Sequence, residues 1–136
     1  MKTEKKNILV VDDQPGNTRL LKLYLEQNDY VVREENDPKA ALASAEKLHP
    51  DLILLDVMMP GMDGGELASR LQANPKLKGV PIVFLTAAVT KGEVEAAQGQ
   101  LGGFPFLAKP VVLAQVLACV KHHLGDAEAA KPSGNA

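Results

Sequence analysis

Four consecutive apolar residues closed by an acid, Leu52-Ile53-Leu54-Leu55-Asp56, stand near the middle of the 136-residue chain. Side chains of a β-strand point alternately to opposite faces of a sheet, so an unbroken apolar run predicts a strand that is covered on both faces. Strands of this kind are typical of parallel sheets with helices on either side. The stretch therefore predicts an α/β fold around a buried parallel sheet.

The same pattern recurs on both sides of this stretch. Strand-like segments occur at 8–11, 30–33, 81–85 and 106–108, and helical apolar periodicity fills the intervals at about 15–28, 38–48, 65–73, 92–101 and 111–123. The segment 30–33 is the most polar strand, which predicts a place nearer the sheet edge. We expect the helix over 92–101, which contains Gly99, to be the weakest. Strands and helices that alternate five times predict a parallel sheet with helices on both faces.

The composition is that of a soluble globular domain, with 46% hydrophobic and 24% charged residues. The net charge of -2 favours neither a nucleic-acid partner nor a membrane surface. Cys119 is the single cysteine, so no disulfide can form within the chain. We expect a cytoplasmic protein with one domain over 1–126 and a flexible tail over 127–136.

Polar residues follow four of the five predicted strands, at the point where each of those four ends. They are Asp12, Asp13, Asp56, Thr86 and Lys109. The carboxyl ends of parallel strands share one edge of the sheet, so these side chains should meet there. Three carboxylates in one place repel one another, and Mg²⁺, which prefers oxygen ligands, relieves that repulsion. A lysine opposite such an ion completes a site for a phosphoryl group, and a carboxylate can itself attack phosphorus.

Four segments of the chain resemble signatures of one family, the receiver domain of bacterial two-component response regulators. They are 8–13, 51–64, 81–87 and 108–110, which occur in the family's order and cover the strand ends described above. The resemblance, which extends over about 5–125 and is chemotaxis-regulator-like, implies a flavodoxin-like doubly wound sheet of five parallel strands in the order 2-1-3-4-5. It also implies a cis peptide bond between Lys109 and Pro110.

The resemblance implies a role for each acidic position. Asp56 would be the phosphoacceptor, taking a phosphoryl group from a sensor histidine kinase or a phosphotransfer protein. Asp12 and Asp13 would hold Mg²⁺ together with Asp56 and the backbone carbonyl of Met58. The protein would thus be a phosphoprotein of a phosphorelay that forms an aspartyl phosphate.

The remaining positions imply a conformational switch. Lys109 would pair with Asp56 or with the phosphoryl oxygens, and Thr86 would move its hydroxyl to the phosphoryl group on activation. Phe106 occupies the aromatic switch position, where the family more often has tyrosine. An unknown downstream protein would bind the face formed by the fourth helix, fifth strand and fifth helix. We expect no direct contact with nucleic acid or membrane, and a homodimer stays among the assemblies that the sequence allows.

Other functions of a similar α/β fold are less well supported. A Mg²⁺-dependent phosphohydrolase with an aspartate nucleophile usually carries a second acid two residues further on, where this chain has Met58. A flavin-binding module would place a phosphate beside Asp12 and Asp13, which would repel it. A receiver that no longer signals by phosphorylation would not need all five site residues. We therefore expect a signalling domain that catalyses only its own phosphorylation and dephosphorylation.

Overall fold

The computed structural model describes residues 5–56, 58–59, 62–86, 100–101 and 104–124. Five parallel strands lie side by side in the sheet. From one edge to the other they are β2 (Val31–Glu35), β1 (Asn7–Val11), β3 (Leu52–Asp56), β6 (Ile82–Thr86) and β8 (Phe104–Ala108). Numbered along the chain, the order is 2-1-3-4-5, so the predicted doubly wound α/β fold is confirmed.

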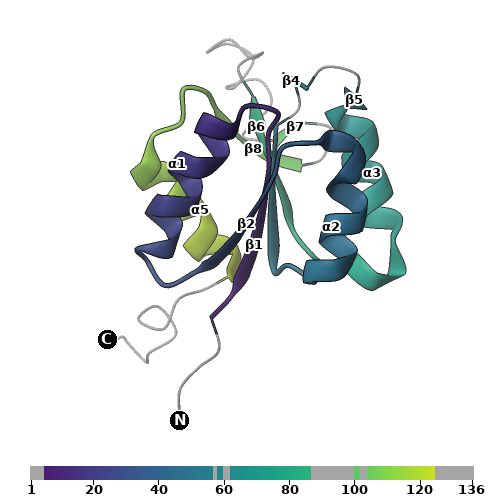
Figure 1. The fold of residues 1–136 in the computed structure, drawn as a ribbon, viewed down its shortest axis with the longest axis horizontal. Coiled ribbons are helices and arrows are strands. Elements are labelled where there is room, and N and C mark those ends of the chain that lie inside the picture. Colours follow the sequence, from purple (N-terminus) through teal and green to yellow (C-terminus); the bar gives the residue numbers. More distant parts are fainter. Residues whose placement is uncertain (1–4, 57, 60–61, 87–99, 102–103, 125–136) are drawn as a thin grey trace.

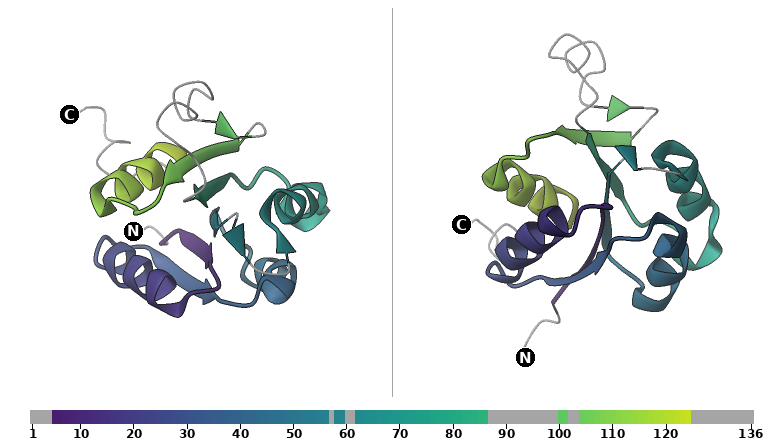
Figure 2. Two further views of the ribbon diagram at one scale, coloured as in Figure 1. Left: turned by 90° about the horizontal axis from the view of Figure 1, so that it is seen from above. Right: turned by 45° about the horizontal axis from the view of Figure 1, so that its top comes forward.

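Helices cover both faces of this sheet. One face carries α1 (Pro15–Glu26) and α5 (Leu113–Leu124), and the other carries α2 (Ala41–Leu48) and α3 (Gly64–Ala73), as Figures 1 and 2 show. Among the described residues, no helix has the length and apolar character that a membrane crossing requires.

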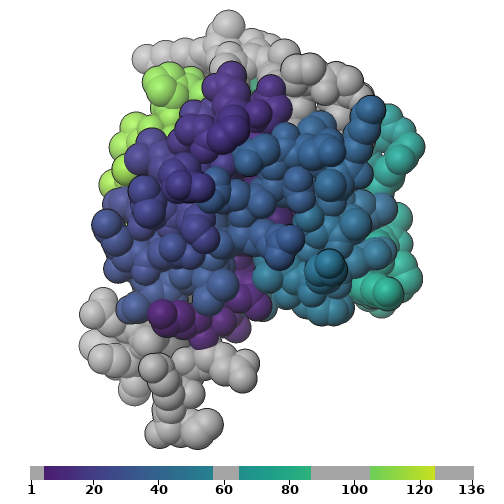
Figure 3. Space-filling view, in the orientation of Figure 1, coloured from purple at the N-terminus to yellow at the C-terminus, as the bar shows by residue number. Residues whose placement is uncertain are grey.

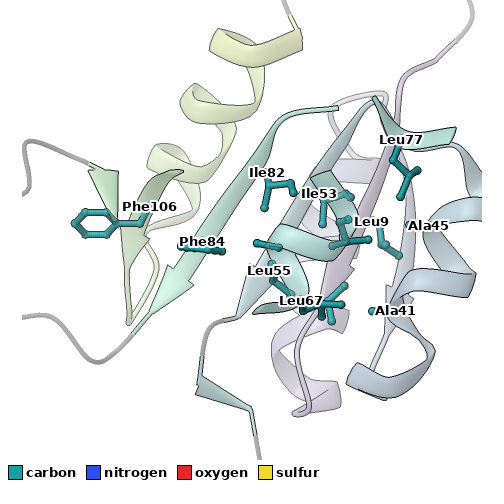
Figure 4. Packing of buried hydrophobic residues seen from close by; sticks show 13 residues of the cluster. Leu9, Ala41, Ala45, Ile53, Leu55, Leu67, Leu77, Ile82, Phe84 and Phe106 are labelled. Carbon is teal, nitrogen blue, oxygen red and sulfur yellow. The ribbon is translucent and has the colours of Figure 1, made fainter. Parts of the chain in front are cut away.

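The two apolar faces explain why the central strand contains no polar residue before its end. Leu52 and Leu54 pack in the cluster beneath α1 and α5, whereas Ile53 and Leu55 pack in the cluster beneath α2 and α3. All four side chains are fully buried. Figure 4 shows the second of these clusters, which spans the sheet from Leu9 to the strands at its far edge.

Side-chain caps begin the two short 3-10 turns within the described part of the chain. Asp37 accepts a hydrogen bond of 2.9 Å from the backbone N–H of Lys39, at the start of η1 (Pro38–Ala40), which leads into α2. The helical segment predicted over 38–48 therefore begins at Pro38, with a 3-10 turn as its first part. Asn74 caps η2 (Pro75–Leu77) in the same way.

The strand β2 forms one edge of the sheet, as its polar sequence predicted, although it continues to Glu35 rather than ending near Arg33. The ammonium group of Lys22, in α1, donates a hydrogen bond of 3.2 Å to the carbonyl oxygen of Val32 in this strand. Lys22 also pairs with Glu26 at 3.2 Å.

The opposite edge differs from the prediction. Gln100 and Leu101 form a short strand, β7, which pairs antiparallel with β8, so the helix predicted over 92–101 is wrong at its last two residues. Residues 92–99 lie outside the described part of the chain. Leu101 pairs with Phe104, and the two glycines that separate them in sequence are typical of a hairpin rather than of a helix. This pairing extends β8 to Phe104, two residues before the predicted start.

A second short hairpin follows β3. Its strands are β4 (Met58–Met59) and β5 (Met62–Asp63), which pair antiparallel and lead into α3. Figure 1 places this hairpin beyond the carboxyl end of β3, at the edge of the sheet where the predicted site residues lie.

Candidate functional site

The carboxyl edge of the parallel sheet brings the predicted acidic residues together. Asp12 and Asp13 directly follow β1, and Asp56 is the last residue of β3, the neighbouring strand. One carboxylate oxygen from each of the three residues lies within 4.8 Å of the other two. Figure 2 (left) looks onto this edge from above.

The ammonium group of Lys109 joins two of these carboxylates. Lys109 follows β8 in the sequence, and its Nζ lies 2.9 Å from Oδ2 of Asp12 and 3.2 Å from Oδ2 of Asp56. Both acids are buried, with 0% and 3% of their surfaces exposed. The site therefore holds three carboxylates beside a lysine that neutralises part of their charge.

Asp12 is bound on both of its carboxylate oxygens. Its Oδ1 accepts from the backbone N–H of Gln14 at 2.9 Å, and its Oδ2 accepts from the side-chain amide of Asn17 at 3.2 Å in addition to Lys109. Burial raises the pKa of Asp12, but the hydrogen bonds from Lys109, Gln14 and Asn17 outweigh it and hold that pKa below 3.8. Asp12 is thus a carboxylate at neutral pH.

The pKa of Lys109 moves in the complementary direction. Burial lowers it, but the hydrogen bond and charge of Asp12, together with those of Asp56, raise the pKa of Lys109 above its ordinary value. Lys109 therefore carries its positive charge in this site.

Thr86 and Lys109 are linked through the backbone. Thr86 ends β6 and is fully buried, and its carbonyl oxygen accepts a hydrogen bond of 2.8 Å from the backbone N–H of Lys109. The peptide bond between Lys109 and Pro110 is cis, as the resemblance implied. The structure therefore brings both residues to the edge that holds the three carboxylates.

Phe106 lies in β8, which β6 separates from β3 and its terminal residue Asp56. It pairs in register with Phe84 of β6, is 8% exposed, and belongs to the cluster beneath α2 and α3 (Figure 4). Met58 lies in β4, two residues after Asp56. The switching role of Phe106 and the metal contact of the Met58 carbonyl stay predictions.

A cavity of about 160 Å³ opens beside the bridged carboxylates. One wall is polar, formed by Asp12, Asn17 and Lys109. The remaining lining is mainly apolar and comes from α1, the end of β6 and the segment after Lys109: Leu20, Leu21, Leu85, Pro110 and Val111. Of the three carboxylates of the cluster, that of Asp12 lines this cavity, whereas Asp13 and Asp56 are not part of its lining.

Two residues at this site were missed from the sequence. Asn17 lies in the first turn of α1 and binds Asp12, whereas Asn36 directly follows β2 and donates a hydrogen bond of 2.8 Å to the backbone carbonyl of Asp12. Asn36 obeys the same rule as the acids, since it stands at the carboxyl end of a strand. The signal was hidden because the second strand was predicted to end near Arg33.

Comparisons with known proteins agree with this geometry. The sequence model of the family described as the response regulator receiver domain matches residues 8–121. The response regulator PleD of Caulobacter vibrioides is 44% identical over 105 residues, which are 76% of this chain and 23% of that protein. The chain thus spans under a quarter of the length of PleD.

Two other similar proteins are close to this chain in length. The polar-differentiation response regulator DivK of Brucella ovis is 30% identical over 122 residues, which cover 90% of this chain and 98% of DivK. The structure of the chemotaxis protein CheY4 of Vibrio cholerae superposes with a TM-score of 0.76 at 28% identity, covering 88% of this chain and 99% of CheY4.

Proposed function

This chain belongs to the response regulator receiver domain family, and from that premise we propose that Asp56 accepts a phosphoryl group from a sensor histidine kinase or a phosphotransfer protein. The observation that carries the proposal is the cluster of three carboxylates within 4.8 Å of one another, two of them bridged by the Lys109 ammonium group. Such a cluster collects the groups that phosphoryl transfer to an aspartate requires.

The carboxylates of this cluster suit Mg²⁺ by number and chemistry. Three acids face one lysine among the described residues, so the site retains an excess of negative charge that a hard divalent cation can balance. Within the same residues the Asp13 carboxylate accepts no hydrogen bond, whereas Asp12 is bound on both oxygens. We assign Asp13 and Asp56 as carboxylate ligands, with Asp12 and the backbone carbonyl of Met58 completing the set. A bound Mg²⁺ would supply positive charge that balances the phosphoryl oxygens.

The transfer step forms one bond and breaks another. A carboxylate oxygen of Asp56 forms a bond to phosphorus while the bond between phosphorus and the donor histidine breaks, and its electron pair stays on the imidazole nitrogen. Lys109, which already contacts Asp56 at 3.2 Å, can move to the phosphoryl oxygens and offset their charge. No proton has to leave Asp56, because the reacting form is the carboxylate.

The response to phosphorylation is proposed to start at Thr86. Its hydroxyl would turn to a phosphoryl oxygen, and Phe106 would repack beside it, which shifts the equilibrium between two shapes of the domain. The downstream protein would read this shift on the face formed by the segment after Thr86, by β8 and by α5. The helix predicted in that segment lies outside the described residues. A homodimer stays among the assemblies that the proposal allows.

The proposed role is signalling rather than turnover of other substrates. Receiver domains are signalling domains, and the chain would catalyse only the gain and loss of its own phosphoryl group. A cytoplasmic location fits the single cysteine, Cys119, which is free and needs no oxidising compartment.

Intact mass spectrometry tests this assignment. The protein is incubated with Mg²⁺ and acetyl phosphate, alongside Asp56→Asn and a matched control, Asp51→Asn. Asp51 stands before the same strand and binds the backbone N–H of Asn7 at 2.8 Å, away from the site. We expect one added phosphoryl group on the wild type and on Asp51→Asn, and none on Asp56→Asn. Equal labelling of Asp56→Asn would assign the acceptor to another residue, and labelling that persists with excess chelator would remove Mg²⁺ from the proposal.

A further inference from the structure

The side chain of Asn36 links three segments at the carboxyl edge of the sheet. Its Nδ2 donates one hydrogen bond of 2.8 Å to the backbone carbonyl of Asp12 and one of 3.0 Å to Oγ1 of Thr18. An amide nitrogen has two hydrogens, so both are used. A backbone carbonyl can only accept, which fixes the orientation of the amide, with its nitrogen toward Asp12.

The end of β2 therefore holds the Asp12 backbone from two directions. The N–H of Asp12 donates to the carbonyl oxygen of Glu35 at 3.1 Å, and the C=O of Asp12 accepts from Asn36. The Asp12 carbonyl belongs to the peptide unit that joins Asp12 to Asp13. Because that unit is planar, fixing its carbonyl fixes where the backbone of Asp13 begins.

Thr18 anchors the Asn36 amide on its other side. The Thr18 hydroxyl is fully buried and donates to Oε1 of Glu34 at 2.8 Å, while Oε2 of Glu34 pairs with Nε of Arg19 at 3.0 Å. Figure 3 shows α1 and the segment from β2 to α2 packed against each other on one face of the molecule. A buried partner of this kind restrains the rotation of the amide.

Asp13 needs such a restraint. Its carboxylate accepts no hydrogen bond from the described residues, although it lies within 4.8 Å of two other carboxylates that repel it. Lys109 offsets the charge of Asp12 and Asp56 through direct ion pairs, but it forms none with Asp13. The direction of the Asp13 side chain consequently depends on its backbone.

We propose that Asn36 is a positioning residue of the metal site, which holds the Asp12–Asp13 peptide so that the Asp13 carboxylate meets those of Asp12 and Asp56. The proposal rests on the proposed function, since it concerns the same acidic cluster. Without the amide, the peptide rotates under carboxylate repulsion and the ligands separate. Mg²⁺ affinity then falls, while Asp56 and Lys109 keep their own contacts.

Two variants with the same substitution separate positioning from general stability. Asn36→Ala removes the bond to Asp12, and Asn28→Ala removes a comparable amide bond of 2.9 Å to the backbone carbonyl of Tyr24, at the far end of α1. Asn36→Ser keeps a short hydroxyl donor and gives a second, milder variant at the same position. The Mg²⁺ concentration that half-saturates the rise in melting temperature is measured for each, with no phosphoryl donor present.

We expect Asn36→Ala to raise the half-saturating Mg²⁺ concentration on the order of tenfold, as loss of an outer contact of a metal site typically does. The half-saturating concentration of Asn36→Ser should lie between those of the wild type and Asn36→Ala, and that of Asn28→Ala should equal the wild-type value. With acetyl phosphate, Asn36→Ala should need more Mg²⁺ yet reach the wild-type maximal rate, because the nucleophile is unchanged.

The outcomes that overturn the inference differ from those that overturn the function. The positioning role is rejected if both Asn36 variants have the half-saturating Mg²⁺ concentration of the wild type. It is also rejected if Asn28→Ala raises that concentration as much as Asn36→Ala does. Asp13→Asn serves as the reference for the site itself. If it responds to Mg²⁺ as the wild type does, Asp13 is not a metal ligand and the inference fails, whereas acceptance at Asp56 is overturned only by labelling of Asp56→Asn.

Discussion

Lys109 and Asp12 lie 97 residues apart in the chain, yet Nζ of the lysine contacts Oδ2 of the acid at 2.9 Å. The side chain of Asp12 is 1% exposed and that of Lys109 is 20% exposed, so the pair is shielded from most of the solvent. Charges in such a place interact strongly, and leaving one of them without its partner is costly.

Replacement of Lys109 by alanine should show that cost. We expect Lys109→Ala to lower the free energy of unfolding without Mg²⁺ by about 3 kcal/mol, because two buried carboxylates lose their ammonium partner. Mg²⁺ binding should persist, and Mg²⁺ should raise the melting temperature of the variant by more than that of the wild type. Lys22→Ala, which removes a half-exposed ion pair with Glu26 and the hydrogen bond to the Val32 carbonyl, is the control and should cost about 1 kcal/mol. If Mg²⁺ raised the melting temperatures of the wild type, Lys109→Ala and Lys22→Ala by the same amount, Lys109 would not be the counterion of the cluster.

Glu34 should contribute to the acid stability of the fold. Burial opposes its ionisation, but hydrogen bonds from Thr18 and Arg19 outweigh burial and hold the pKa of Glu34 below 4.5. A lowered pKa adds stability that is complete above the unfolded-state value and is lost as the pH falls through the folded-state value. The expected loss therefore lies below about pH 4.5.

Glu34→Gln measures this contribution. The wild type should be more stable than the variant by on the order of 1 kcal/mol at neutral pH, since Arg19 lies largely in solvent and weakens its share. The difference should shrink as the pH falls below 4.5, by at most about 1.4 kcal/mol per pH unit. Urea unfolding at a series of pH values checks it. A difference that stays constant down to pH 3 would mean that the folded and unfolded states share one pKa for Glu34.

Thr86→Val should separate phosphorylation from the response to it. Valine has the shape of threonine without the hydroxyl, and at this buried position we expect a stability loss of about 1 kcal/mol. Asp56 should still accept a phosphoryl group, while the change in amide hydrogen exchange along β8 that follows phosphorylation of the wild type should disappear. Thr86→Ser, which keeps the hydroxyl, should restore that change. A full β8 response in Thr86→Val would exclude the hydroxyl from the switch.

The strands and the acidic cluster were predictable because both follow from local order. Leu52 to Leu55 are apolar on both faces, so they specify a buried strand without reference to the rest of the chain. Parallel pairing then brings the residue after each strand to one edge, which is why Asp12, Asp56 and Lys109 could be grouped before any distance was known.

Other parts depend on tertiary contacts that leave little trace in the sequence. Gln100 and Leu101 fit a weak helical pattern, but pairing with β8 outweighs that local preference. Glu34, near the end of β2, accepts a hydrogen bond from Thr18 of the neighbouring helix α1. A charged residue at this position made the end of the strand hard to recognise in the sequence. Asn36 was missed because the strand that it follows was predicted to end earlier. Its partners Asp12 and Thr18 also lie far from it in the sequence, so no local pattern pointed to their contact.

Lys22, which donates a hydrogen bond to the edge strand β2, affects how readily copies of the protein associate with one another at high concentration. Val31 and Glu35 bond toward β1, so the backbone of Val32, between them, points outward from the sheet. A bare outward carbonyl on an outer strand is a template for strand addition from a neighbouring chain. Lys22 covers that oxygen with a charged group, so fibre-like stacking along β2 would have to break this hydrogen bond and desolvate an ammonium ion.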